Sequence, residues 1–381
     1  RVDCSANVGA IFRESKDAEA TILEGRKAVA DLLNAPSYNT IVSGESATSL
    51  LFSLSYALGR ECTGHENVVT TDYEHYANVS PWIELEKRGT IREVRFARLN
   101  KAEGTLDLDH FKQLIDGKTR VVTVTAASNV LGAKSPLHEI RKIARAAGAY
   151  LVVDAVHHAP HGPIDVQAID CDFLVFSGYK MFSSHGSFLY GKEDLLDRLK
   201  PYKVAPAKDE PPYKWEWGTR NQSMFAAISG VVDHLAWLAD EIGSSYGKSV
   251  EAYSGRSRSL KIAMHAIEEY GRDLSRAILQ GVDDLPGLLQ MRRVKVYGLT
   301  DPNRLDERDP TFAFKVQGTP DQEVVEHLWN RYGVALRAED FYSRVHAVYD
   351  APTMVRASLV HYNTAEEVGQ LLKAIDELDG A

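Results

Sequence analysis

The 381-residue chain has little cysteine and no long apolar run, and each scarcity excludes a class of protein. Its three cysteines, Cys4, Cys62 and Cys171, have neither the paired spacing of a zinc site nor the density of a disulfide scaffold. No stretch reaches the roughly 18 consecutive apolar residues that a membrane helix needs. We therefore predict a cytoplasmic protein that binds no metal and does not enter a membrane.

Positive charge is also scarce, because 44 lysines and arginines face 53 aspartates and glutamates, a formal net charge of −9. Proteins that bind nucleic acid usually carry a basic surface, so we predict no nucleic-acid partner. The chain also lacks internal repeats and low-complexity segments. Its 44% apolar and 25% charged residues are typical of a globular enzyme with one large core and a second, smaller one.

Between about residues 15 and 245, short apolar runs alternate with helical patterns. The predicted strands are Thr40–Val42, Val68–Thr71, Arg120–Thr125, Tyr150–Val153, Phe173–Phe176 and Phe188–Tyr190, and the predicted helices include Ala18–Leu33, Ala47–Leu58, Pro136–Ala147 and Met224–Ile242. This alternation predicts an α/β domain whose mostly parallel sheet is covered by helices. In such sheets the ligand lies beyond the carboxyl ends of the strands.

After residue 245 the pattern changes to a smaller α+β unit. We predict helices at Arg256–Tyr270, Leu274–Val282, Asp321–Tyr332 and Ala365–Leu378, and strands at Arg293–Tyr297, Thr311–Val316 and Val355–Val360. The predicted domains are therefore a large domain at 15–245 and a small one at 246–381. Residues 1–14 are expected to be an incomplete segment that belongs to the small domain.

Lys180 and Asp154 each follow a buried strand pattern, so both are expected at the mouth of the same crevice. Most lysines are solvated or ion-paired, and that remains the alternative for Lys180. A pyridoxal phosphate enzyme requires such a pair, because the lysine condenses with the cofactor aldehyde and the carboxylate keeps the pyridine nitrogen protonated. By itself, the pair is weak evidence.

Two further features strengthen this interpretation. Ser46 begins a helix directly after a strand, which predicts an anion site, with plain N-capping as the alternative. His75 also follows a strand, where its ring could stack on a cofactor, although single histidines more often have a structural role. Ser177 precedes Lys180 and offers a second hydroxyl to the same phosphate.

Four motifs in order resemble the class V aminotransferase group of fold-type-I pyridoxal phosphate enzymes, and within it the cysteine desulfurase-like branch. They are "EHYANVSPW", "AASNVLG", "DAVHHAPHGPIDVQAIDCDFLVFSGYKMF" and "VRASLVHYNTAEEV". The resemblance covers nearly the whole chain, except the segment that the family places before Asn7. It implies a transferase fold like that of aspartate aminotransferase, with a seven-stranded, mostly parallel sheet.

The resemblance also implies roles for particular residues. Lys180 would bind the cofactor as a Schiff base, Asp154 would pair with the ring nitrogen, and His75 would stack on the ring. The predicted cofactor-binding residues are Ser46, Ala47, His75, Asn129, Asp154, His157, Ser177, Lys180 and Thr219, of which Asn129 and His157 lie near the phenolic oxygen. Thr219 would reach the phosphate in a partner subunit, which implies a homodimer. Tyr179 replaces a histidine that many members have before the lysine.

The substrate side departs from the family. Arg356 matches an arginine that grips a substrate α-carboxylate, a task that suits its planar fork, and Asn129 and Phe341 are predicted beside the substrate. Desulfurases carry a sulfur-accepting cysteine before this arginine, but the segment from Arg337 to Arg356 has none. Counted back from Arg356 by the family's spacing, the position of that cysteine falls near Phe341. Phe341, Tyr342, His346 and Tyr349 are expected to line the substrate side, with core packing as the alternative.

We therefore predict a pyridoxal phosphate-dependent lyase of the desulfurase-like branch that acts on a small α-amino acid. The reaction would pass through an external aldimine and a carbanion, quinonoid or enamine, without a persulfide cysteine. A class V aminotransferase and a β-decarboxylase or aldolase-type carbon–carbon bond-forming enzyme are the alternatives. A non-catalytic scaffold is the non-enzyme alternative, although a scaffold needs none of Lys180, Asp154 and Arg356.

Overall fold

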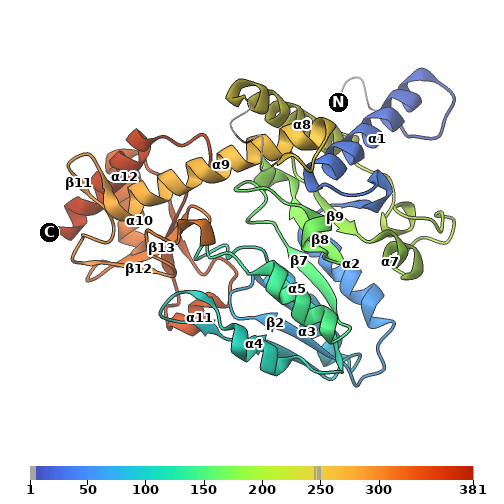
Figure 1. Cartoon of the computed structure of the whole chain (residues 1–381), viewed down its shortest axis with the longest axis horizontal. Helices are drawn as coiled ribbons and strands as arrows, with labels where there is room; N and C mark the ends of the chain where they lie inside the picture. The colour runs from blue at the N-terminus through green and yellow to red at the C-terminus, as the bar shows by residue number, and fades with distance from the viewer. Residues whose placement is uncertain (1–5, 244–245, 247–249, 381) are drawn as a thin grey trace.

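Seven strands form the central sheet in the order β1-β9-β8-β7-β6-β2-β3 (Figure 1). The computed structural model describes residues 6–243, 246 and 250–380. The strands are β1 (Ile41–Gly44), β2 (Asn67–Thr71), β3 (Glu93–Ala97), β6 (Thr119–Thr125), β7 (Tyr150–Asp154), β8 (Phe173–Ser177) and β9 (Ser187–Gly191). β3, β2, β6, β7 and β8 are parallel neighbours, and β9 is antiparallel to both β8 and β1. The prediction of a seven-stranded, mostly parallel sheet is confirmed.

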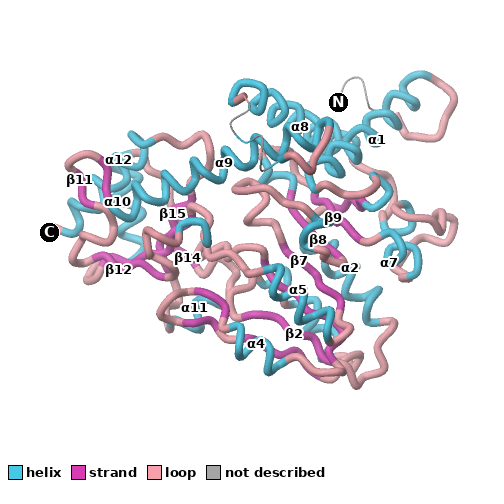
Figure 2. Tube along the Cα trace, viewed as in Figure 1, coloured by secondary structure: helices cyan, strands magenta, loops and turns pink. Residues whose placement is uncertain are grey.

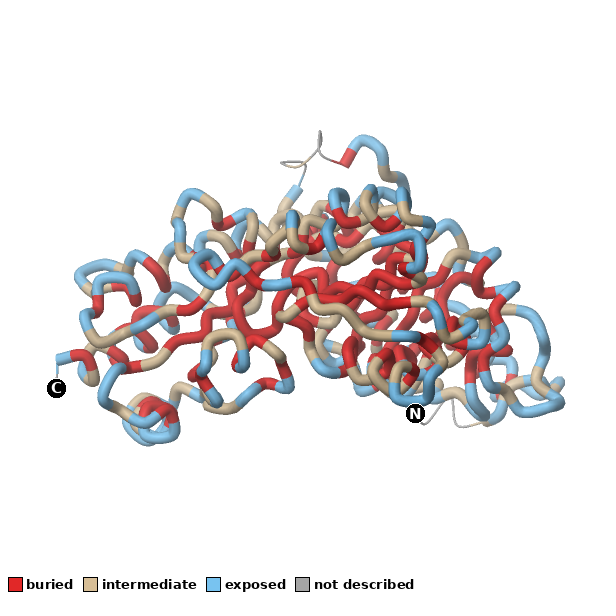
Figure 3. Tube along the Cα trace, turned by 90° about the horizontal axis from the view of Figure 1, so that it is seen from below, coloured by how far each residue is buried: buried red, intermediate tan, exposed pale blue. Residues whose placement is uncertain are grey.

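Both faces of this sheet are buried, which explains the continuous apolar runs. Successive residues of β7 face opposite sides, so Val152 packs in the core with α2 while Leu151 and Val153 pack in the core with α1 and α8. The helices of this part are α1 (Arg13–Leu33), α2 (Ala47–Gly59), α3 (Ser80–Lys87), α4 (Leu108–Leu114), α5 (Leu137–Ala146), α6 (Val166–Ile169), α7 (Glu193–Arg198) and α8 (Gln222–Ile242). Figure 3 shows buried segments through the middle of the molecule and exposed ones outside.

The C-terminal part has its own sheet and core. Its antiparallel strands run in the order β12-β13-β15-β14 and lie apart from the large sheet (Figure 2). The elements are β12 (Val294–Tyr297), β13 (Thr311–Val316), β14 (Arg337–Glu339), β15 (Met354–Ser358), α10 (Asp321–Tyr332), α11 (Val345–Tyr349) and α12 (Ala365–Asp379). Two short pairs complete the strands: β4 (Leu99–Asn100) with β5 (Thr105–Leu106), and β10 (Gly281–Val282) with β11 (Leu285–Pro286). The smaller α+β unit is confirmed.

One long helix, α9 (Gly255–Gln280), joins the two parts (Figure 1). The sequence suggested two helices here, and that prediction is wrong. Gly271, which lies between the two predicted helices, is buried inside the one helix. The residues before it, such as Leu260, pack in the large core, and those after it, such as Leu274, pack in the small one. Because one helix serves both cores, the predicted boundary at residue 245 stays a prediction.

The N-terminal segment lies beside the large sheet domain in its described part. Gln222 of α8 donates to the carbonyl of Ala6, and Ser15 of α1 donates to the carbonyl of Asn7 at 2.7 Å. The sequence-based prediction grouped residues 1–14 with the small domain, but these contacts are with the large one. Cys4 lies outside the described residues. None of the described helices has the length and apolar character to cross a membrane.

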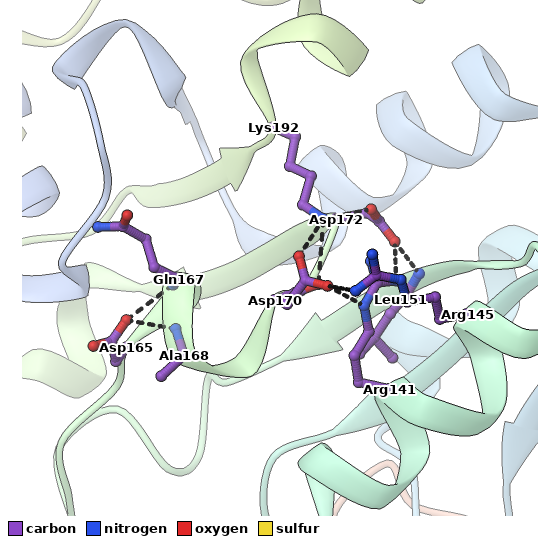
Figure 4. Close-up of polar contacts among 9 residues, drawn as sticks. All are labelled: Arg141, Arg145, Leu151, Asp165, Gln167, Ala168, Asp170, Asp172 and Lys192. Atoms are coloured by element: carbon purple, nitrogen blue, oxygen red, sulfur yellow. Dashed lines mark hydrogen bonds and ion pairs between the residues drawn. The ribbon is translucent and has the colours of Figure 1, made fainter.

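An ionic network fixes the amino-terminal ends of the central strands (Figure 4). The Asp172 carboxylate accepts from the Leu151 amide at 2.8 Å and from Arg141 at 2.9 Å, and it pairs with Lys192 at 3.2 Å. Asp170 binds the same two cations. The network ties β7, β8 and α5 together at the strand ends opposite Asp154 and Lys180.

Candidate functional site

A cavity opens at the carboxyl ends of the parallel strands, where the sequence placed the ligand. Its volume is about 570 Å³, counting space open to solvent, within the range of small-molecule sites. All the predicted cofactor-binding residues except Thr219 line it. The lining residues are Ser46, Ala47, Thr48, His75, Ala77, Thr125, Asn129, Asp154, Val156, His157, Ser177, Tyr179 and Lys180.

Lys180 enters the cavity from the single turn that follows β8. The turn is tight, since a Cβ on Gly178 would lie 3.0 Å from the Ser184 carbonyl oxygen, and a larger residue would have to displace backbone. Burial, aided by the positive charge of Arg356, lowers the pKa of Lys180 to about 8, although Asp154 acts in the opposite direction. The amine therefore lies much closer to its neutral, nucleophilic form than an exposed lysine does.

Asp154 is the last residue of β7 and is only 3% exposed. Burial raises its pKa to about 6, whereas a hydrogen bond from the Val156 amide at 2.9 Å and the nearby Lys180 charge oppose that rise. A buried carboxyl in this position suits a heterocyclic nitrogen, because a shared proton removes the cost of an isolated charge.

His75 follows β2 and presents a neutral ring. Its Nδ1 accepts a hydrogen bond from the Ala77 amide at 3.0 Å, which leaves the ring proton on Nε2. Burial, together with the positive charges of Lys180 and Arg356, lowers its pKa to about 4. A neutral aromatic ring in the cavity wall can cover the face of a flat ligand without adding a second positive charge beside Lys180.

The start of α2 supplies an anion site. Ser46 is the N-cap of this 13-residue helix, and its side chain accepts from the Ser49 amide while Ser49 Oγ accepts from the Ser46 amide. The next residues, Ala47 and Thr48, line the cavity with their amides in the first turn, where a helix leaves its N–H groups unpaired. Ser177, which accepts a hydrogen bond from Ser187 at 3.1 Å, lines the same cavity.

Two buried polar atoms near the cavity have no partner among the described residues: Asn129 Oδ1 and His157 Nε2. Such orphaned atoms indicate a missing ligand, because unpaired polar groups are costly to bury. Asn129 differs from the expectation in one respect, since its amide nitrogen donates to the Phe341 carbonyl at 3.0 Å. Of these two side chains, only His157 has a buried nitrogen, Nε2, without a partner among the described residues. An anion site, a buried carboxyl, a lysine and a neutral ring together fit pyridoxal phosphate.

Of the predicted substrate-binding residues, Asn129 lines this cavity, whereas Arg356 and Phe341 lie next to it. Arg356 in β15 donates to the Asn129 carbonyl at 2.8 Å, and its guanidinium carbon lies 4.0 Å from the centre of the Phe341 ring. Burial lowers the Arg356 pKa to about 10, so the side chain remains charged at neutral pH. Phe341 thus covers one face of Arg356 and leaves the edges of the fork for an anion.

The segment Asp340–Arg344 is held against the His75 loop by contacts that the sequence did not reveal. The Tyr76 amide donates to the Tyr342 carbonyl at 2.7 Å, and Ser343 Oγ donates to the Glu74 carbonyl at 3.1 Å. Arg344 pairs with Asp72 at 3.1 Å. His346 contacts the Ala351 carbonyl and lies with its ring centre 6.1 Å from that of Phe341, whereas Tyr349 packs on the Tyr297 ring. Their predicted place on the substrate side stays a prediction.

Glu74 is a buried residue that sequence reasoning missed. It accepts hydrogen bonds from Thr71 at 2.6 Å, from Asn78 at 2.8 Å and from the Thr125 amide at 3.0 Å. Burial raises its pKa to about 8 against these three donors. The carboxyl links the His75 loop to the end of β6, and nothing in its local sequence distinguishes it from a surface glutamate.

Thr219 lies in a second cavity, with Gly44, Ser49 and Trp215 among its lining residues. Ser49 belongs to the first turn of α2, so the two cavities flank the start of one helix. Within one chain, therefore, Thr219 does not join the other predicted cofactor residues. Its predicted role across a dimer interface stays a prediction.

Neither described cysteine lines the Lys180 cavity. Cys171 is buried just before β8, at the strand end opposite Lys180, and burial raises its pKa well above the ordinary value. Burial also raises the pKa of Cys62 to about 11. Both thiols are therefore poor nucleophiles near neutral pH.

Comparison with known proteins adds independent information. The family model described as aminotransferase class-V matches residues 2–255 and 257–371. A probable cysteine desulfurase from Synechocystis sp. is 33% identical over 366 residues, which cover 92% of this chain and 78% of the relative. A cysteine desulfurase from Haloferax volcanii is 30% identical over 381 residues, covering 96% of this chain and 81% of the relative.

Two solved structures resemble the whole chain. The crystal structure of the cysteine desulfurase CsdA from Escherichia coli has a TM-score of 0.80 at 26% identity and covers 98% of this chain and 88% of that one. The apo structure of a cysteine desulfurase from Thermococcus onnurineus has a TM-score of 0.82 at 25% identity, with coverage of 99% and 88%.

Proposed function

The chain belongs to the aminotransferase class-V family of pyridoxal phosphate-dependent enzymes, and we propose that it is a lyase that removes a β-substituent from a small α-amino acid. The observation that carries this proposal is the single cavity lined by Lys180, Asp154, His75 and the start of α2. When bound there, pyridoxal phosphate supplies an aldehyde that condenses with amines and a ring that accepts an electron pair.

The chain's own residues support that chemistry in distinct ways. Ser46, the first amides of α2 and Ser177 bind the phosphate, and His75 covers one face of the ring. Asp154 holds a proton on the ring nitrogen. The Lys180 amine, with its pKa near 8, accepts and returns the substrate proton once it is free. Arg356 binds the substrate carboxylate through an edge of its fork.

The relatives' names favour cysteine as the substrate, because several are called cysteine desulfurases. The family spacing would place a sulfur-accepting thiol near Phe341, a residue that is buried against Arg356. Neither Cys62 nor Cys171 lines the cavity. We therefore propose a β-elimination in which the β-substituent leaves with the bonding electron pair and takes up a proton, as hydrogen sulfide from cysteine, without bonding to an enzyme thiol. Water then hydrolyses the released dehydroamino acid to a keto acid and ammonia.

The test is to incubate the holoenzyme with a panel of amino acids that includes cysteine, and to assay sulfide, alanine, pyruvate, ammonia and carbon dioxide. A Lys180→Ala variant is the control for lysine-dependent turnover. With cysteine we expect sulfide, pyruvate and ammonia in equal amounts, and a variant with Cys4→Ser, Cys62→Ala and Cys171→Ala together should keep most of the activity. Intact-protein mass spectrometry should detect no added sulfur.

Two outcomes contradict the proposal. Loss of turnover in the cysteine-free variant, with sulfur bound to the wild-type protein, would restore persulfide chemistry. Accumulation of pyridoxamine phosphate with amino acid alone would favour an aminotransferase instead. Both readouts are independent of which amino acid in the panel proves best.

We also propose a homodimer in which Thr219 reaches the phosphate site of the partner subunit. This agrees with the position of Thr219 outside its own cofactor cavity but beside the same α2 helix. Sedimentation should give twice the chain mass. Mixed dimers of Lys180→Ala and Thr219→Ala chains should regain activity that each homodimer lacks, and a monomeric active enzyme would contradict the proposed dimer.

A further inference from the structure

A pair of buried histidines lies behind the cavity, and the reaction described above does not use the second of them. His157 lines the cavity with its free Nε2, and the centre of its ring lies 5.1 Å from that of His161. The two residues are 8% and 5% exposed. His161 does not line the cavity, so its contact with the site passes through His157.

A buried carboxylate from the C-terminal part of the chain contacts His158, which lies between the two histidines in the sequence. Asp309 is 1% exposed, and both of its oxygens lie 3.1 Å from His158 Nδ1. Lys134, which also pairs with Glu268 of α9, lies 3.9 Å from Asp309. These partners hold the carboxylate charged, and they lower its pKa well below the ordinary value despite its burial.

Burial keeps both rings of the pair neutral. It lowers the pKa of His161 to about 4 and the pKa of His157 well below its ordinary value. Asp309 opposes this shift at both rings. The positive charge of Lys180 lowers the pKa of both rings further. Arg356 has the same effect on His157, and His158 and Lys134 have it on His161. Since no group of three or more His, Cys, Asp or Glu among the described residues is arranged to hold a metal ion, the cluster is not a metal site.

We propose that His161 is a positioning residue that holds the His157 ring so that its free nitrogen faces the cofactor cavity, and that Asp309, through its contact with His158, fixes the segment that carries both rings. A neutral imidazole can turn about its side-chain torsion, and a second ring packed on it limits that freedom. An N–H held toward the cavity then donates to an acceptor on the bound ring. The inference deepens the proposed function and depends on it only for the identity of the cofactor.

The test measures two properties of the reconstituted holoenzyme other than activity: the dissociation constant for pyridoxal phosphate and the pH midpoint of its visible absorbance. We expect His161→Phe to raise the dissociation constant about fivefold, which is the loss of one hydrogen bond. The midpoint should rise by roughly half to one pH unit, because an anionic oxygen that loses a donor holds its proton more tightly.

A double-mutant cycle shows whether His161 acts through His157. In a His157→Phe background, His161→Phe should change the dissociation constant by less than about twofold, and the pH midpoint by less than the corresponding ~0.3 unit. Asp309→Asn is a second route to the same effect and should move the midpoint in the same direction by less. The matched control is Asp172→Asn, which removes a carboxylate from a cation-rich network at the opposite strand ends (Figure 4) and should change neither property.

The outcomes separate this inference from the proposed function. If folded His161→Phe and Asp309→Asn proteins bind and absorb as the wild type does, His161 has no positioning role. Equal effects of His161→Phe with and without His157 would contradict action through that ring. A wild-type chain that binds no pyridoxal phosphate contradicts both this inference and the proposed function.

Discussion

Burial moves three side chains around the cavity toward their neutral forms. The pKa of Lys180 falls to about 8, that of Asp154 rises to about 6 and that of His75 falls to about 4. Desolvation is the largest cause in each case. Near neutral pH, therefore, a substantial fraction of the lysine is available as a nucleophile, while the imidazole adds no competing charge.

The Lys180 amine should titrate in the apoprotein in a way that its two neighbours control. Competitive labelling with acetic anhydride, read by peptide mass spectrometry, should give half-maximal reactivity near pH 8. Arg356→Gln should raise that midpoint, because it removes a positive charge that disfavours the ammonium form. Asp154→Asn should lower it, because it removes a stabilising negative charge. The exposed Lys373 serves as the reference for reagent reactivity, and shifts of the same sign in both variants would contradict the assigned electrostatics.

The sequence predicted the cavity residues that directly follow strands, and it missed those whose partners are distant in the chain. Lys180, Asp154 and His75 follow apolar runs, and the carboxyl ends of parallel strands meet at one edge. By contrast, the Asn129 amide is occupied by Phe341, more than two hundred positions away. Asp309 was missed for the same reason, since its contact with His158 forms only when the C-terminal part packs on the sheet.

Two helices begin with the same capping arrangement but in different surroundings. Ser46 caps α2 at the cavity, and Thr364 caps α12, where its partner is Glu367. Each cap satisfies backbone amides that the first turn leaves unpaired. Only the start of α2 lines the cofactor cavity. Substitutions of the two capping residues can therefore distinguish an effect on helix stability from an effect on ligand binding.

Ser46→Ala and Thr364→Ala should each lower the free energy of unfolding by about 1 kcal/mol, the usual value of an N-cap. Only Ser46→Ala should also weaken pyridoxal phosphate binding, because it removes a hydroxyl from the anion site. Urea unfolding of the apoproteins and equilibrium dialysis with the cofactor measure the two effects. Equal cofactor affinities in the two variants would show that Ser46 is merely a cap.

The predicted bounds were most accurate where the apolar residues follow the period of the element clearly. Thr311–Val316 and Asp321–Tyr332 match β13 and α10 as they stand. β3 was missed because it is an edge strand whose residues are mostly half-buried, so its apolar pattern is weak. The division of α9 into two helices has a different source, since the helix continues through Gly271, a residue of low helix propensity, because its two halves are buried in the two cores.

The two parts of the molecule meet at the loop between β6 and α5, which contains Asn129. The Asp309 amide donates to the Gly132 carbonyl, and the Lys134 amide donates to the Glu307 carbonyl, both at 2.9 Å. Gly132 has a φ of +73°, and a Cβ there would lie 2.6 Å from the Asp309 carbonyl oxygen. A glycine at this position therefore allows the C-terminal backbone to approach the sheet domain and to bring Asp309 toward the histidine pair.

Gly132→Ala should consequently lower the free energy of unfolding for two reasons: alanine is strained at this positive φ, and its Cβ would clash with the backbone of the C-terminal part. Gly148 is the matched control, because it has a φ of +71° but a Cβ added there would have no atom within 4 Å beyond its chain neighbours. Gly148→Ala should cost about 1–2 kcal/mol from the left-handed conformation, and Gly132→Ala about 1–3 kcal/mol more from the clash with backbone. Urea unfolding measures both, and only Gly132→Ala should weaken cofactor binding. Equal losses in the two variants would mean that the loop does not set the distance between the sheet domain and the C-terminal part.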